Sequence, residues 1–144
     1  MKSQRTKQIK EFGDFQTPIT LAEAILTKLK SDGLSPGSIV EPTCGTGSFI
    51  LTALKIFPSA KVYGFDINST YIDIIKSKLG QLDNRESVSL DTVNFFDFNW
   101  RGFLEKIASP YLIVGNLPWV TSSELGKIKG QNIPQKSVLP WRIR

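Results

Sequence analysis

Hydrophobic residues recur along this chain at two alternating spacings, one typical of helices and the other of strands. Apolar residues three and four positions apart predict helices over about 20–31, 48–57, 69–79 and 100–107. Short apolar runs predict strands over 38–41, 61–65, 88–95 and 111–114. This alternation predicts an α/β fold with a mainly parallel sheet and helices on both of its faces.

Several residues mark where these helices start and stop. Thr20 and Glu23 have the spacing of a capping box, so we expect the first helix to begin near Thr20. Pro58 ends the second helix, because proline cannot donate the next helical hydrogen bond. Asn68 or Ser69 can cap the third helix with a side-chain oxygen.

The domain organisation follows from length and periodicity. Residues 1–11 are polar and basic without a repeating apolar pattern, and we predict a flexible tail there. Residues 12–144 are then a single domain, since the chain has 144 residues in all.

Composition excludes several classes of function. The chain has no histidine, which excludes a Ser-His triad and His-ligated zinc, and we expect no metal. Its single cysteine cannot form an internal disulfide, which favours a reducing compartment, the cytoplasm. We find neither a signal peptide nor a run of the roughly 20 apolar residues that a membrane span needs. The net charge of +5 fits an ordinary basic protein as well as one with a polyanionic partner.

The most unusual residue clusters follow the predicted strands, where parallel sheets bind ligands. The first cluster runs from Glu41 through Thr43, Gly45 and Gly47 to the start of the second helix. Its glycines can take positive φ and let a ligand approach the backbone. Glu41 would repel a phosphate and attract an ammonium or sulfonium cation, and no lysine stands where a phosphate-binding loop has one. The alternative is a tight turn that needs glycines and binds nothing.

The next two strand ends carry carboxylates. Asp66 stands where a carboxylate can accept hydrogen bonds from ribose hydroxyls, and Ile67 can cover an adenine ring. Asp97 can accept from an adenine amino group. The alternatives are a helix cap or surface acid for Asp66, and a solvated acid beside core aromatics for Asp97.

The fourth cluster points to the reaction. Asn116 and the carbonyl of Leu117 can both accept hydrogen bonds from an NH2 group. Pro118 restricts Leu117 to extended conformations, and Trp119 offers a flat face to a flipped base. The alternative is a proline turn with a tryptophan in the core.

In their order along the chain, the segments FGDFQTP, EPTCGTGSF, GFDI, FFDF and VGNLPW resemble the N6-adenine DNA methyltransferases of restriction-modification systems. The resemblance covers about residues 12–125. It implies a Rossmann-like fold, S-adenosylmethionine as cofactor, and double-stranded DNA with a flipped adenine as substrate.

The resemblance also implies a role for each matching residue. The methionine end of the cofactor would be lined by Phe15, Gln16, Thr17 and Pro18, with Glu41 facing its amino group and Thr43, Gly45 and Gly47 shaping the floor. Asp66 and Ile67 would hold the ribose and cover the adenine, and Asp97 with Phe98 would hold the adenine. The catalytic segment would be Asn116, Leu117, Pro118 and Trp119, with Asn116 also beside the cofactor.

The sequence departs from this family in two ways. Leu117 stands where a second proline is commoner, which we expect to matter little because that position acts through its carbonyl. The chain also stops after the fourth predicted strand, and from Val138 it no longer looks like the family. We interpret it as a truncated domain that lacks a C-terminal region or pairs with a second subunit.

Three other functions fit parts of the pattern. An rRNA adenine dimethyltransferase shares the Asn-Leu-Pro-aromatic segment but usually lacks FQTP. A protein-glutamine methyltransferase is a second alternative. The third is a catalytically inactive fragment or subunit that only binds the cofactor.

Overall fold

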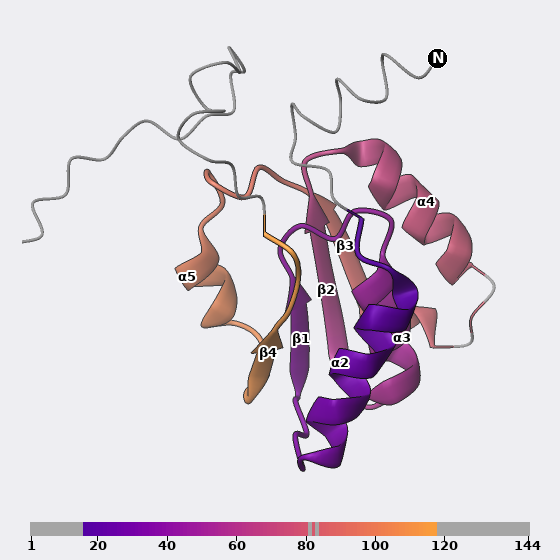
Figure 1. The fold of residues 1–144 in the computed structure, drawn as a ribbon. Coiled ribbons are helices and arrows are strands. Elements are labelled where there is room, and N and C mark those ends of the chain that lie inside the picture. Colours follow the sequence, from indigo (N-terminus) through magenta and orange to yellow (C-terminus); the bar gives the residue numbers. More distant parts are fainter. Residues whose placement is uncertain (1–15, 81, 83, 118–144) are drawn as a thin grey trace, which may run out of the picture.

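The computed structural model describes residues 16–80, 82 and 84–117, which form a parallel sheet flanked by helices (Figure 1). Its strands are β1 Ser38–Glu41, β2 Lys61–Asp66, β3 Val88–Thr92 and β4 Tyr111–Ile113. They stand in the order β3-β2-β1-β4, and all neighbours are parallel. The chain thus proceeds outward from β1 to β3 and then crosses to the other side of β1. Ligands bind in open sheets of this kind where the strand order reverses, here beside β1 and β4.

Helices lie on both faces of this sheet, which confirms the predicted architecture (Figure 1). The helices on one face are α2 Ile19–Ser31, α3 Ser48–Ile56 and α4 Ser69–Leu79. There α2 packs on α3, α3 packs on β1 and β2, and α4 packs on β2 and β3. The opposite face carries α5 Trp100–Leu104, and a short 3-10 helix, η1 Arg85–Ser87, precedes β3. Within the described chain, most of the helical cover is therefore on one face.

The main hydrophobic core lies between the sheet and α2, α3 and α4. Its fully buried members include Leu26 of α2, Ile39 of β1 and Ile75 of α4. Gly64 of β2 allows α3 to approach closely, because an added Cβ there would lie 2.8 Å from Ile50. This packing fixes the amino end of α3, and with it the loop that joins β1 to α3.

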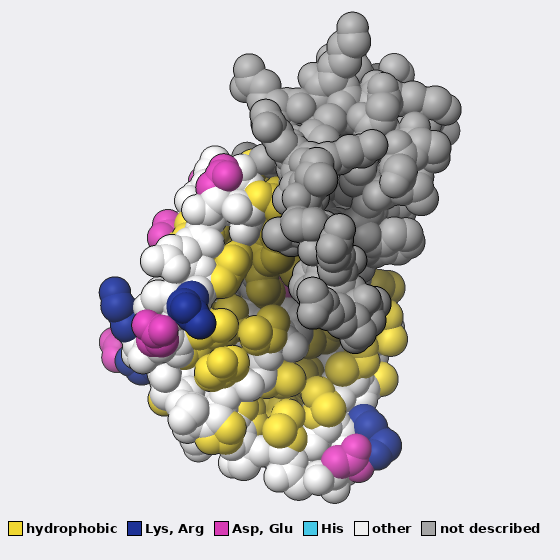
Figure 2. Space-filling view, turned by 90° about the vertical axis from the view of Figure 1, so that its left-hand side faces the viewer, with side chains coloured by type: hydrophobic (Ala, Val, Ile, Leu, Met, Phe, Trp, Pro, Cys, Tyr) yellow, Lys and Arg dark blue, Asp and Glu magenta, His cyan; other side chains and the backbone are white. Residues whose placement is uncertain are grey.

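The face that carries α5 is more open. Next to the buried Val40 in the sheet register stand Tyr63 and Ile113. The ring of Tyr63 packs edge-to-face on Phe103 of α5, whereas Ile113 is 50% exposed. Figure 2 shows hydrophobic side chains gathered on this side of the molecule. The side chains of β2 are thus packed against α5, whereas Ile113 of the edge strand β4 is largely exposed.

One predicted helix cap is wrong. We expected a capping box with Thr20, but α2 begins at Ile19 with Pro18 in the capping position and no side-chain cap. The carbonyl of Pro18 accepts from the amides of Leu21 and Ala22. Proline has a fixed φ that suits a helix start, so it displaces the boundary that the threonine signal indicated. The Asn68 cap of α4 is confirmed, because its side chain accepts from the amide of Thr70 at 3.0 Å.

Two other boundaries also differ from the prediction. Strand β3 ends at Thr92 and not at Phe95, since Asn94 folds the chain into a turn. The Asn94 carbonyl accepts from the amides of Asp97 and Phe98 at 3.1 Å each. Helix α5 ends at Leu104, three residues short of the predicted end at 107.

Candidate functional site

The loop between β1 and α3 has the glycine geometry that the sequence predicts. Gly45 and Gly47 have φ angles of 49° and 86°, in the left-handed region that favours glycine. Gly47 is also the capping residue of α3, and a Cβ there would lie 2.7 Å from Ile75. The amide of Gly47 donates to the carbonyl of Cys44 at 2.8 Å. The loop is thus a tight turn pressed against α4 at the start of a helix.

Asp66 fastens this loop to the end of β2. One of its carboxylate oxygens accepts from the Gly45 amide at 2.8 Å, and the other accepts from the Asn68 amide at 2.8 Å. The Cys44 amide donates to the carbonyl of Phe65 at 2.7 Å. Asp66 is only 8% exposed, and each carboxylate oxygen can accept a second hydrogen bond. Asp66 therefore organises the loop at the end of β2.

Glu41 brings a second buried carboxylate to the same place. It is 4% exposed, and its Oε2 has no hydrogen-bond partner within the part of the chain that the structure describes. Burial raises the pKa of Glu41 well above its usual range; the backbone N–H of Ile50 lowers this pKa, and the nearby charge of Asp66 raises it further. A buried carboxylate oxygen without a partner is costly, and a bound cation would relieve that cost.

The segment before α2 lies against the glycine loop. Gln16 Oε1 accepts from the amide of Thr46 at 2.9 Å and from its hydroxyl at 3.0 Å. The hydroxyl of Ser48 donates to the carbonyl of Thr17 at 2.7 Å. Pro18 follows as the exposed cap of α2. Of the four residues predicted to line the methionine end, Gln16 contacts the loop and Thr17 contacts the start of α3, Pro18 begins α2, and Phe15 lies outside the described residues.

The loop after β4 meets the loop after β1. The Val114 amide donates to the Val40 carbonyl at 3.0 Å, which extends the strand pairing beyond β4. The hydroxyl of Thr43 donates to the carbonyl of Asn116 at 3.3 Å. Asn116 and Leu117 are exposed. Two segments that are far apart in sequence, one from the glycine loop and one from the predicted catalytic segment, are therefore in direct contact.

Pro118 and Trp119 lie outside the described residues, as does the predicted basic tail 1–11. Their roles stay predictions.

The adenine side of the predicted pocket is more exposed. Ile67 follows Asp66 and is 39% exposed. Asp97 is exposed and stands in the turn after β3, where its carboxylate accepts from the side chain of Asn94. The ring of Phe98 lies 5.1 Å from that of Phe65. The structure places these residues near the end of β2, and their contact with an adenine stays a prediction.

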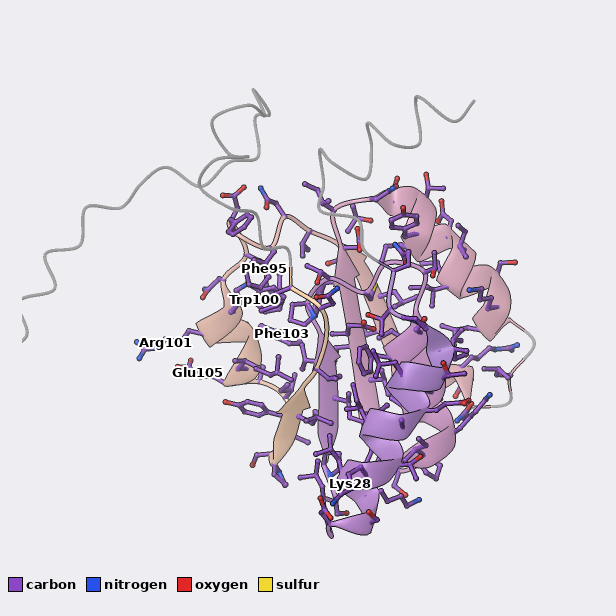
Figure 3. All side chains as sticks on the ribbon, in the orientation of Figure 1. Lys28, Phe95, Trp100, Arg101, Phe103 and Glu105 are labelled. Carbon is purple, nitrogen blue, oxygen red and sulfur yellow. The ribbon has the colours of Figure 1, made fainter. Side chains whose placement is uncertain are left out.

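Phe98 belongs to an aromatic cluster between α5 and the sheet. Its ring centroid lies 4.6 Å from that of Trp100, and Trp100 lies 5.3 Å from Phe65. Figure 3 shows Phe95, Trp100 and Phe103 side by side there. The indole N–H of Trp100 donates to the Phe95 carbonyl at 2.8 Å, which ties the turn after β3 to α5.

Sequence reasoning missed two polar contacts that shape the site. Asn94 holds the Asp97 turn, and an asparagine a few residues before an aspartate in a turn is a signal that could have indicated it. Lys78 of α4 donates to the carbonyl of Thr46 at 3.0 Å, and no local sequence pattern indicates this contact.

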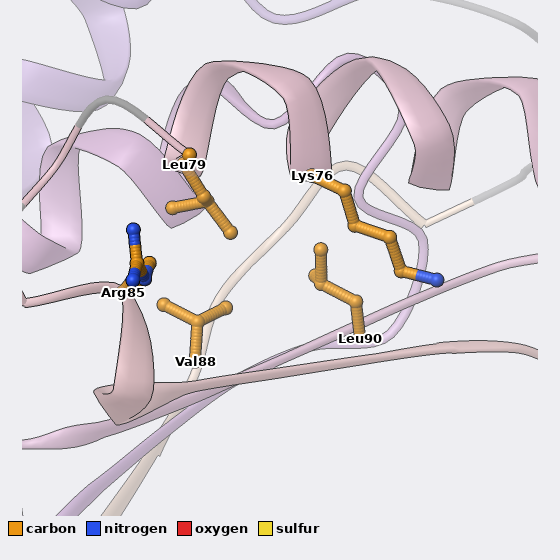
Figure 4. Close-up of a pocket in the computed structure, with 6 residues that line it drawn as sticks. Lys76, Leu79, Arg85, Val88 and Leu90 are labelled. Carbon is orange, nitrogen blue, oxygen red and sulfur yellow. The ribbon is translucent and has the colours of Figure 1, made fainter.

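A small cavity lies away from these residues. It is bordered by Leu79, Val88 and Leu90, with Lys76 and Arg85 beside them, between α4 and β3 (Figure 4). Because Val88 begins β3, this cavity is toward the amino end of that strand, whereas the candidate site is at the carboxyl ends.

Two further structural findings concern the described ranges alone. Among residues 16–80, 82 and 84–117, no three His, Cys, Asp or Glu side chains are grouped so that they could hold a metal ion. Over the same ranges, no helix has the length and apolar character that a membrane crossing requires.

Comparison with solved structures defines the class of fold. The protein named "putative RNA methyltransferase PH1948" from Pyrococcus horikoshii matches with a TM-score of 0.56 over 72% of this chain and 48% of that one, at 21% identity. At this identity the likeness shows the fold alone. The fold is the Rossmann-like fold of S-adenosylmethionine-dependent methyltransferases, here with the strands that the described residues contain.

Comparison of sequences gives the family. The family model described as N-6 DNA Methylase matches residues 1–130. The Type II methyltransferase M.NspV of Nostoc sp. is 46% identical over 88% of this chain and 26% of its own length. The modification methylase CviBIII of Paramecium bursaria Chlorella virus NC1A is 31% identical over 83% of this chain and 28% of its own length.

The chain belongs to the N-6 DNA methylase family. This confirms the resemblance on which the site roles were based. The chain spans about a quarter of the length of these curated relatives.

Proposed function

We propose that the protein transfers the methyl group of S-adenosylmethionine to the N6 amine of adenine in double-stranded DNA, within a restriction-modification system. The family supports the reaction, and one observation supports the site: Thr43 joins the glycine loop to Asn116. A methyl donor held by that loop would therefore lie beside the groups that accept from the amine. We also propose that the protein acts in the cytoplasm, and that a C-terminal region or second subunit completes the DNA contacts.

The residues at the ends of β1 and β2 suit the charge and shape of this cofactor. Glu41 Oε2 is buried without a partner in the described chain, and it offers a charged acceptor to the ammonium group. Asp66 can accept from ribose hydroxyls while it keeps its bonds to Gly45 and Asn68. Ile67, Asp97 and Phe98 would surround the adenine. The cofactor supplies an activated methyl group on a sulfonium sulfur.

The chain's own contribution to the reaction is to orient the amine. The adenine N6 lone pair is delocalised into the ring, which makes it a poor nucleophile. The side-chain oxygen of Asn116 and the carbonyl of Leu117 would accept its two hydrogens and localise the lone pair toward the methyl group. Preorganised dipoles of this kind contribute about 3 kcal/mol each, and positioning contributes roughly 7 kcal/mol or more.

This mechanism needs no strong base. The N6 nitrogen would bond to the methyl carbon as the carbon–sulfur bond breaks, and the amine would then release a proton to solvent. The chain has no histidine, so its composition agrees with a reaction that relies on acceptors and positioning. Trp119 would stack on the flipped base, and Pro118 would hold the Leu117 carbonyl in place.

Calorimetry and transfer assays test the proposal in two stages. The chain is titrated with S-adenosylmethionine, and binding is expected; its absence would remove the cofactor role. Tritiated cofactor is then offered with duplex DNA, rRNA or release factor as the acceptor. Label in N6-methyladenine of DNA supports the proposal. Label in rRNA, or in a glutamine of release factor, would instead support the rRNA or the protein-glutamine methyltransferase alternative.

A further inference from the structure

The backbone N–H and C=O of Thr46, in the glycine loop, are both bound by side chains from elements that are remote in sequence. Gln16, which precedes α2, accepts from both the amide and the hydroxyl of Thr46. Lys78, in the last turn of α4, donates to the carbonyl of the same residue at 3.0 Å. The N–H of Thr46 is part of the Gly45–Thr46 peptide and its C=O is part of the Thr46–Gly47 peptide, so the two peptide units on either side of Thr46 are fixed by different parts of the fold.

Gln16 also packs closely on the loop. A Cβ added to Gly45 would lie 2.5 Å from Gln16 Oε1, so the side chain rests directly over that glycine. Gly45 is held on another side by Asp66, whose carboxylate accepts from its amide. The loop is thus enclosed between a buried aspartate and an exposed glutamine.

Thr17, which follows Gln16, is also attached to the region of the glycine loop. The hydroxyl of Ser48, at the start of α3, donates to the carbonyl of Thr17 at 2.7 Å. The segment before α2 is therefore attached at consecutive positions, one on the loop and one on the helix that follows. The oxygen of Gln16 is directed to the loop by two hydrogen bonds.

We propose that Gln16 is a positioning residue: it holds the Gly45–Thr46 peptide in the conformation that binds the cofactor, and it acts through Thr46. This inference rests on the proposed function and deepens it, since it separates Gln16 from the groups that would contact the cofactor. Because the bonds to Gln16 lie at an exposed site, their loss is expected to weaken cofactor binding by about five- to tenfold.

The test compares variants of the 144-residue chain. Gln16→Met keeps side-chain length and removes the acceptor, whereas Gln16→Glu keeps an acceptor oxygen. Thr27→Met is the matched control, because it places the same side chain at an exposed position of α2. Thr46→Val removes one of the two donors and leaves Gln16 in place. Thermal unfolding of each variant verifies that the fold is intact.

Two measurements are made on each variant: hydrogen exchange of the Thr46 amide by NMR, and S-adenosylmethionine affinity by calorimetry. Gln16→Met is expected to speed exchange and weaken affinity, with Gln16→Glu and Thr27→Met close to wild type and Thr46→Val between them. Unchanged exchange in Gln16→Met overturns the proposal. So does faster exchange with unchanged affinity, or equal loss of affinity in Gln16→Glu. A wild-type chain that binds no cofactor overturns the proposed function, and the exchange result then still decides whether Gln16 holds the loop.

Discussion

The strand ends of this sheet fall into two halves that are built differently. At the ends of β1 and β2, the carboxylates of the candidate site are buried: Glu41 is 4% exposed and Asp66 is 8% exposed. After β3 and β4, Asp97 and Asn116 are exposed. Asp66 ties separate strand ends together through backbone amides, whereas Asp97 is bonded within its own turn and Asn116 is joined to β1 through Thr43.

This difference suits the ligand that we propose for each half. A cofactor of nucleotide size can be enclosed, so buried and preorganised groups can serve it without reorganisation. A base flipped from a duplex enters from outside, and its acceptors have to lie at the surface. The comparison predicts that changes in the buried half alter stability and cofactor affinity, and that changes in the exposed half alter methyl transfer.

The largest effect is expected at Asn116. Asn116→Ala removes a side-chain acceptor for the amine and should lower methyl transfer by about 100-fold or more. Cofactor affinity should stay within twofold of wild type. Leu117→Ala keeps its main-chain carbonyl and should lose less than tenfold. These rates are measured with tritiated cofactor in a form of the protein that methylates DNA; wild-type turnover in Asn116→Ala would remove it from the mechanism.

Gly47 tests the buried half through stability. Gly47→Ala is strained at φ 86° and places a Cβ 2.7 Å from Ile75, so it should lower the free energy of unfolding by about 2–4 kcal/mol. Gly33→Ala is the control, because φ is 90° there and no atom lies within 4 Å of the added Cβ. Urea unfolding measures both. Equal losses would show that contact with α4 contributes nothing.

The negative charge of Glu41 is expected to contribute to cofactor affinity. Glu41→Gln keeps shape and burial but removes the negative charge opposite the ammonium group, so cofactor affinity should fall about tenfold or more. Calorimetry measures this at pH 7. An affinity equal to wild type would mean that Glu41 does not face the cofactor's cation.

Without cofactor, Glu41→Gln is expected to stabilise the folded chain, although it weakens cofactor binding. Burial raises the pKa of Glu41 in the folded state, so the folded chain binds this proton more tightly than the unfolded chain does. The contribution of Glu41 to the free energy of unfolding of the wild type is therefore lost as pH rises, from the pKa of Glu41 in the unfolded chain up through its raised pKa in the folded chain. Glu41→Gln should raise the melting temperature at pH 7–8 by about 2–4 °C, and the gain should vanish toward pH 4. A gain that is constant with pH would contradict this.

The smallest effect is expected at Thr43. Thr43→Val removes the bond to the Asn116 carbonyl and should lower methyl transfer by about three- to tenfold, since it loses one hydrogen bond at 3.3 Å. Thr43→Ser should restore transfer, and both variants should bind the cofactor like wild type. If both variants lose affinity and not turnover, Thr43 belongs to the cofactor half alone.

The sequence was sufficient for the features that depend on local pattern. Apolar spacing predicted the alternating elements, and the glycines predicted the positive φ angles at Gly45 and Gly47. Local competition explains the errors: Pro18 starts α2 earlier than Thr20 would, and Asn94 turns the chain before Phe95. Each correction shifts a boundary and leaves the element in place.

The contacts that join the site could not be predicted, because they link residues distant in sequence. Gln16 and Thr46 are 30 positions apart, and Thr43 and Asn116 are 73 apart. Such pairs meet only after the strands pair and the helices pack. The unpartnered oxygen of Glu41 likewise depends on burial in the folded chain, although the place of Glu41 at the end of a strand was visible in the sequence.

The most direct test of the central claim is a crystal structure of this chain with S-adenosylhomocysteine. The amino group of the ligand is expected at the carboxylate of Glu41 and its ribose hydroxyls at Asp66, above Gly45 and Gly47. A ligand bound elsewhere on the sheet, with Glu41 still unpaired, would contradict the account.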